Sequence, residues 1–305
     1  MSLGVLNNIS ATYAANNLNN SQASLQNVLT QLSSGSRINS GADDAAGLSL
    51  ADGLLANQTA LAQSARNTSQ GVGLLQTADG ALSQVNNLLN RAVTLATEAG
   101  NGTMNTAQNA AANQEYQSIL VEINNIGKTT TFNGQAVFGT TGAAPAPANF
   151  SIYTSDGSAI GTSSDTISIA GLSSKSVGDV GGTIASGAGN SITYTVGTGV
   201  DLTAAGLDLT NSANAQATLT AINSAISDVA AQRGYLGSQI NTLNSMSSVM
   251  TTQNENLASA QNSVMATDYS TATSMMSKFQ ILTQTGISAL AQANSTQQEV
   301  LKLMQ

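Results

Sequence analysis

Apolar residues recur every seven positions along two long stretches of this chain, residues 54–96 and 222–264. A heptad repeat kept over this length predicts helices that pack against other helices along their whole length. At about 1.5 Å per residue, each stretch predicts a helix of roughly 65 Å. The repeat positions are Leu54, Leu61, Thr68, Leu75, Leu82, Leu89 and Ala96, then Ile222, Val229, Leu236, Leu243, Met250, Leu257 and Val264.

Apolar residues at both chain ends step by four and three, which predicts an amphipathic helix at each terminus. Two such helices with only each other to pack on make a weak core, so we expect them to assemble with further copies. The first 36 residues carry no charge, which indicates burial; a disordered polar leader in the free monomer is the alternative. The expected assembly residues are Leu18, Leu25, Leu29, Leu32, Phe279, Leu282, Leu290, Val300 and Leu303.

The intervening pattern completes the expected order of elements. We expect helices at 3–34, from about 43 to 99, at 106–127 and at 213–267, with Ser40 and Asp43 as a capping-box-like start of the second. Asn133 and Gly134 between short apolar runs predict a β-hairpin. Residues 141–209 hold both prolines and alternate apolar with polar residues, as in 166–169 and 192–196, which predicts a small all-β insert.

The predicted fold is therefore mainly α: a long helical coiled-coil rod built from N- and C-terminal segments, with a β-hairpin and the inserted domain. We expect a terminal coiled-coil domain from 1–41 plus 268–305, a rod domain from 42–140 plus 210–267, and a surface-exposed domain from 141–209. The apolar alternations of the insert are short, so we expect it to be self-contained and dispensable for polymerisation.

Charge excludes several classes of partner. The chain has 8 basic and 16 acidic residues, a net charge of −8, and its basic residues are scattered. Nucleic-acid binding and attraction to an anionic membrane need clustered positive charge, so neither is expected. No apolar run approaches the roughly 18 residues that would span a bilayer. The first fifteen residues lack the basic and apolar character of a signal peptide, so we expect export by another route.

Catalytic chemistry has little support in this composition. Cys and His are absent, which removes the thiol nucleophile, the imidazole base and the soft metal ligands. Asp43 and Asp44 are adjacent carboxylates, but two acids at a helix start serve far more often as caps than as a catalytic dyad. We expect no enzyme activity, no cofactor and no metal.

Several motifs, in order along the chain, resemble bacterial flagellin. LSSGSRINSGADDAAGLSLA at 32–51 is similar to the family signature and contains Arg37, Asn39, Asp43 and Asp44. The resemblance continues in NLLNRAVTLATEAGNGT at 87–103, TTTFNG at 129–134, AISDVAAQRGYLGSQIN at 225–241, ENLASA at 255–260 and QAN at 292–294.

The resemblance implies a secreted, extracellular subunit of the flagellar filament, exported unfolded through the flagellar type III channel. Its implied partners are further copies of itself, an export chaperone, and cap and hook-junction proteins. It also implies that the chain ends form the inner tube of the filament. A hook-filament junction protein is a weaker alternative because the rod-domain motifs are complete, and a stalked adhesin would need an anchor.

The family also implies a host innate receptor that detects flagellin on its rod helices. The matching residues are Arg91, Leu95 and Glu115, of which the first two lie four apart on one predicted helix. Thr94 stands where the family often has Glu, and Asn90 where Gln is common. The alternative is that Arg91 is simply a solvated residue of the rod.

Overall fold

The computed structural model describes residues 8–139, 148–155, 164–169, 172, 174, 177, 180–185, 191–196 and 199–303. These residues are mostly helical, which confirms the predicted fold class. The contacts divide the chain into two compact units. One, here the terminal unit, comprises Met1–Ala56 and Asn256–Gln305; the other, the central unit, is Asn57–Glu255. The predicted division into three domains stays a prediction.

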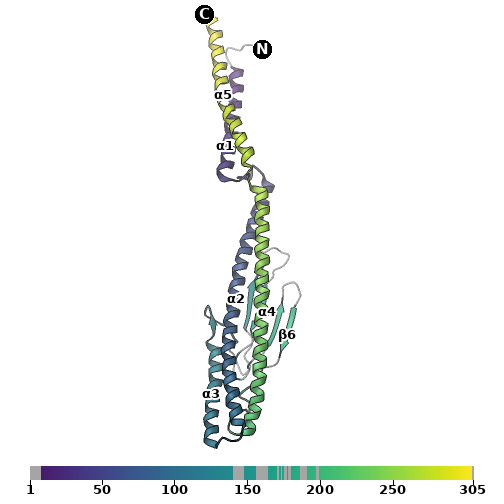
Figure 1. Cartoon of the computed structure of the whole chain (residues 1–305). Helices are drawn as coiled ribbons and strands as arrows, with labels where there is room; N and C mark the ends of the chain where they lie inside the picture. Colours follow the sequence, from purple (N-terminus) through teal and green to yellow (C-terminus); the bar gives the residue numbers. More distant parts are fainter. Residues whose placement is uncertain are drawn as a thin grey trace. The chain divides into compact units, whose positions relative to one another are not determined.

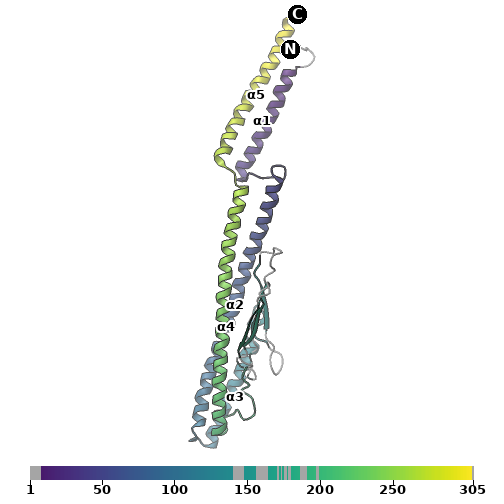
Figure 2. The same cartoon turned by 90° about the vertical axis from the view of Figure 1, so that its right-hand side faces the viewer.

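The terminal unit pairs the two end helices, α1 (Ile9–Ser34) and α5 (Tyr269–Leu303), side by side in both views (Figures 1 and 2). They are antiparallel, because Asn8 Nδ2 donates to the Ala293 carbonyl at 2.9 Å while Thr267 N donates to the Gly35 carbonyl at 3.1 Å. The Asn8 side chain caps α1 by accepting from Ala11 N. Gly35 ends it with a φ of +70°, a left-handed conformation that favours glycine.

The seam of this pair keeps a strict alternation of three- and four-residue steps on both helices, as in a coiled coil. Its positions are Ala11, Ala14, Leu18, Ser21, Leu25, Val28 and Leu32 in α1, and Ala272, Met276, Phe279, Thr283, Gly286, Leu290 and Ala293 in α5. Among the described side chains of the two helices, only Val28 and Ala272 are fully buried. The isolated pair therefore has a thin core.

Three helices build the central unit: most of α2 (Ala45–Gly100), α3 (Thr106–Thr129) and most of α4 (Ser212–Met265). The heptad prediction is confirmed here, because Leu75, Leu82 and Leu89 of α2 are completely buried, as are Ile222 and Leu236 of α4. Asn105 and Gln108 form a capping box at the start of α3, which fixes its first turn.

The predicted hairpin follows α3 as β1 (Thr131–Phe132) and β2 (Gln135–Ala136), paired antiparallel. Asn133 and Gly134 have φ values of 51° and 77°. Two successive positive φ angles give the turn that matches the twist of a hairpin, and Asn-Gly is the pair that adopts it most readily. Val137 and Phe138, directly after the hairpin, are completely buried in the core of the central unit.

Four antiparallel strands form the insert in the order β3 (Ala148–Tyr153), β4 (Ser164–Ile169), β5 (Val180–Ala185) and β6 (Ser191–Val196). The predicted strands at 166–169 and 192–196 are present. The expectation that the insert is self-contained is wrong, because Ile152, Ile167 and Ile169 belong to the same hydrophobic core as α2, α3 and α4. Parts of the predicted insert, residues 141–147, 156–163, 170–171, 173, 175–176, 178–179, 186–190 and 197–198, lie outside the described part of the chain.

Candidate functional site

Large apolar side chains of α1 and α5 are exposed to solvent outside their seam. Tyr13 is 67% exposed and Ile281 is 63% exposed. Single exposed apolar residues are normal on a protein surface, but a group this large on two adjacent helices is typical of an interaction surface. We call this group the outer apolar set: Ile9, Tyr13, Leu29, Met275, Ile281, Leu282 and Ile287.

The structure corrects the predicted face of two assembly residues. Leu29 and Leu282 were expected to share a face with the other terminal residues, but they lie outside the seam and are 45% and 41% exposed. Val28 and Thr283 occupy the seam instead. The reason is that a seam with steps of three and four takes one residue of each adjacent pair, and the register between the helices decides which one.

The other predicted assembly residues divide into two groups. Leu18, Leu25, Leu32, Phe279 and Leu290 lie in the seam and are partly buried. A Cβ placed on Gly286 would lie 3.2 Å from Leu18 Cδ1, so glycine permits a close approach of the two helices there.

Val300 and Leu303 belong to α5, but their side chains lie outside the described part of the chain. Sequence reasoning missed Ile9, Tyr13, Met275, Ile281 and Ile287, because they fall off the heptad. The charge-free composition of α1, on every face of the helix, was the available indication.

The signature residues form the segment that joins α1 to α2. Arg37 Nη2 donates to the Val264 carbonyl at 3.0 Å, and Arg37 N donates to the Met265 carbonyl at 2.6 Å, which ties this segment to the end of α4. The Asn39 side chain donates to the Ser36 carbonyl at 2.7 Å. The signature therefore has a structural role in the terminal unit.

Only one of the two adjacent aspartates caps α2, and it is Asp44, whereas the prediction assigned the cap to Ser40 and Asp43. Asp44 caps α2 by accepting from Gly47 N at 2.9 Å. Asp43 instead closes the preceding turn, where its Oδ2 accepts from the backbone N–H groups of Asn39 and Ser40 at 3.0 and 2.9 Å. These hydrogen bonds lower the pKa of Asp43 because they stabilise its charged form. Ser40 and Asp43 thus do not form the expected helix cap.

Asp268 has the corresponding position before α5. Its carboxylate accepts from Ser270 N at 2.9 Å and from the Thr271 hydroxyl at 2.7 Å. The hydrogen bonds from Thr271, followed by the one from Ser270, lower the pKa of Asp268. Both segments that connect the end helices to the long helices are therefore closed by a carboxylate.

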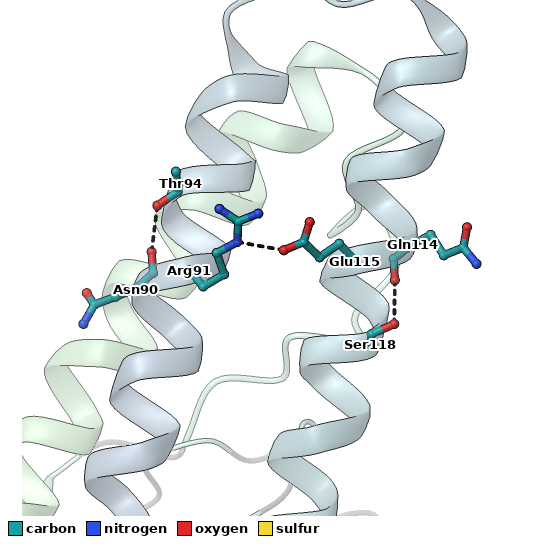
Figure 3. A network of polar contacts seen from close by, with 6 residues as sticks. All are labelled: Asn90, Arg91, Thr94, Gln114, Glu115 and Ser118. Carbon is teal, nitrogen blue, oxygen red and sulfur yellow. Dashed lines mark hydrogen bonds and ion pairs between the residues drawn. The ribbon is translucent and has the colours of Figure 1, made fainter.

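Two of the three predicted receptor residues meet on the surface of the central unit. Arg91 Nε on α2 donates to Glu115 Oε1 on α3 at 2.7 Å, and the two side chains are 55% and 44% exposed (Figure 3). The hydrogen bond from Arg91 lowers the pKa of Glu115. Leu95 is corrected: only 3% of it is exposed, so it belongs to the hydrophobic core and is not available on the surface with Arg91.

A search of the described residues finds no group of three or more His, Cys, Asp and Glu side chains that could hold a metal ion. In the same part of the chain, no helix is long and apolar enough to cross a membrane.

Comparison with known proteins matches both ends of the chain. The model of the bacterial flagellin N-terminal helical region matches residues 5–143, and that of the C-terminal helical region matches residues 219–304. A flagellin from Halalkalibacterium halodurans is 31% identical over 293 residues, which cover 94% of this chain and 93% of that protein. A flagellin from Bacillus subtilis is 31% identical over 306 residues, covering 97% and 98%. The crystal structure of Bacillus cereus flagellin is 29% identical, with a TM-score of 0.45, and the match covers 64% of this chain and 94% of that one.

Proposed function

The chain belongs to the bacterial flagellin family and is a structural subunit of the flagellar filament; we propose that it assembles by burying the outer apolar set of α1 and α5 against neighbouring copies. The filament is the extracellular propeller of the flagellum. The subunit is a structural protein, not an enzyme.

The observation that carries the proposal is the small core between α1 and α5, where only Val28 and Ala272 of the described side chains are fully buried. Fully burying one large apolar side chain is worth roughly 1.5–3 kcal/mol. The outer apolar set offers seven such side chains. Ordering a residue costs about 1–2 kcal/mol of backbone entropy, so a pair of helices with two fully buried side chains gains little by folding alone. Burial against neighbours supplies the missing stabilisation.

Coupling between folding and assembly follows from this proposal. The ends stay poorly ordered in the free subunit and fold on the growing filament, so the chain passes unfolded through the type III export channel. The terminal helices then line the inner tube of the filament. Resemblance to the family adds an export chaperone, a cap and hook-junction proteins as partners.

Removing the terminal segments tests the proposal. A variant without residues 1–36 and 270–305 loses the outer apolar set but keeps the whole central unit. We expect a folded helical monomer by circular dichroism that forms no filaments in electron micrographs after salt-induced assembly. Normal filaments from this variant would contradict the proposal.

A second proposed partner is the host innate receptor for flagellin, supported by the exposure of the Arg91–Glu115 pair. An arginine at the centre of an interface commonly contributes about 2 kcal/mol or more. We expect Arg91→Ala to reduce receptor signalling at least tenfold while helical melting changes little, because the exposed pair adds little to stability. Equal signalling by both proteins would remove Arg91 from the contact. Absence of signalling from either would mean that this subunit is not recognised.

A further inference from the structure

The insert rests on a specific point of α2. A Cβ built on Gly71 would overlap Ile152 Cδ1 of β3, so the isoleucine fills the space that a side chain would occupy. The same Cβ position lies 3.4 Å from Leu243 Cδ1 of α4. Gly71 is therefore the place where the insert, α2 and α4 meet.

Polar contacts extend this attachment along α2 toward its N-terminal end. Ser64 Oγ, which is buried, donates to the Ser155 carbonyl at 2.8 Å, about two helical turns from Gly71. Between them, Asn67 Nδ2 donates to the Tyr153 carbonyl at 3.5 Å. The strand β3 and its end thus follow residues 64–71 of α2.

A second attachment fixes the insert to α3. The Leu172 carbonyl packs directly on Gly127, where a Cβ would overlap it. Asn124 exchanges two hydrogen bonds with Ser174, at 2.8 and 2.9 Å. The buried Tyr116 hydroxyl donates to the Leu202 carbonyl at 3.1 Å. The insert is therefore held by two different helices.

The hairpin and the insert contact different faces of α2. Beside Arg91, α2 is flanked by α3 (Figure 3), and at Gly73 a Cβ would lie 3.5 Å from the Phe132 ring of the hairpin. Gly71 lies two residues away, about 200° around the helix, so the insert packs on the other side of α2, from Gly71 to Ser64. The apolar side chains of the insert and of the helices form one core.

We propose that the insert is a brace: it packs on residues 64–71 of α2 next to α4, it is also attached to α3, and it holds α2 against α4. The insert then has a function in the stability of the helices, in addition to any role of its solvent-facing surface. This proposal concerns the free subunit and does not depend on how the filament assembles.

Glycine substitutions along α2 provide matched tests. Gly71→Ala places a methyl group where Ile152 lies, whereas Gly80→Ala meets nothing within 4 Å and serves as the control. The measurements are the melting of helical circular dichroism at 222 nm in the depolymerised monomer and hydrogen exchange of residues 61–75. We expect G71A to lower the midpoint by about 4 °C or more and to accelerate exchange there. G80A should keep or raise the midpoint, because alanine favours helix.

A double variant distinguishes the loss of contact between the insert and α2 from a local effect of the new methyl group on α4. Ile152→Ala alone should also lower the helical midpoint, because it loosens the attachment. The double variant G71A/I152A should lose less than the sum of the two single shifts, because the shortened side chain makes room for the new methyl group. Additive shifts would place the effect at Leu243 and overturn the proposal. Helical melting of G71A and I152A that matches G80A would show that the insert is an appendage.

Discussion

At the scale of single residues, carboxylates control the connections of the end helices. Asp43 and Asp268 each close a turn by accepting backbone hydrogen bonds, and their pKa values lie below the ordinary value for Asp. A carboxyl group with a lowered pKa in the folded state stabilises the fold above its unfolded pKa, and this contribution is lost as the pH falls through the folded pKa. Low pH should therefore loosen the terminal unit.

We predict a flat pH dependence of stability between about pH 5 and 8, since the chain has no His and no Cys, the side chains that titrate most readily there. At pH values below about 4, where the carboxylates become protonated, the melting midpoint should decrease. Asp268→Ala should lower the midpoint at neutral pH and make the acid-induced loss smaller. Asp52→Ala, an exposed aspartate within α2, is the control. An unchanged acid profile in D268A would refute this role of Asp268.

At the scale of elements, we expect Leu18 in the seam of α1 and Leu29 outside it to respond differently to substitution by alanine. Leu18 packs on Gly286 in the seam, whereas Leu29 faces outward. We expect L29A to leave the helix content of the monomer unchanged but to raise the subunit concentration needed for filaments by roughly tenfold, equivalent to about 1.4 kcal/mol. L18A should raise this concentration further, because it also weakens the α1–α5 seam that forms on assembly.

Circular dichroism of the monomer and sedimentation of filaments over a concentration series measure these two effects. An L29A subunit that polymerises like the unmodified protein would mean that the outward face of α1 is not an assembly surface. An increase in the required subunit concentration as large as that of L18A would mean that Leu29 is part of the seam.

The elements themselves could largely be predicted from sequence, because the heptads are long and the Asn-Gly hairpin is a strong local pattern. The phase of the terminal seam could not. Val28 and Leu29 are adjacent apolar residues, and in α5 the polar Thr283 lies in the seam while Leu282 is exposed. A periodic pattern identifies a helix, but the partner selects its buried face.

The attachment of the insert was also beyond sequence analysis. Strand alternation predicts a sheet but not the surface on which the sheet packs. In the sequence, Gly71 and Gly127 are only weak helix formers inside helices. The structure shows that they make room for Ile152 and Leu172, which are distant in the chain. Likewise, four-residue spacing placed Leu95 with Arg91, whereas the neighbouring helix buries it.

At the scale of the whole molecule, the two units differ in how completely they bury their apolar side chains. The central unit has a continuous core that includes Leu75, Leu89, Tyr116 and Leu236. The terminal unit pairs two helices around a partly buried seam and leaves the outer apolar set in solvent. We therefore expect the central unit to be stable alone and, as proposed, the terminal unit to gain its stability from other copies.

Hydrogen exchange of the full-length protein, measured by mass spectrometry in the monomer and in the filament, tests this difference most directly. The amides of α1 and α5 should exchange rapidly in the monomer and become strongly protected in the filament, because neighbours bury the outer apolar set. The amides around Leu82 and Leu236 should be protected in both states. Strong protection of α1 and α5 in the monomer, unchanged on assembly, would contradict the coupling of folding to polymerisation.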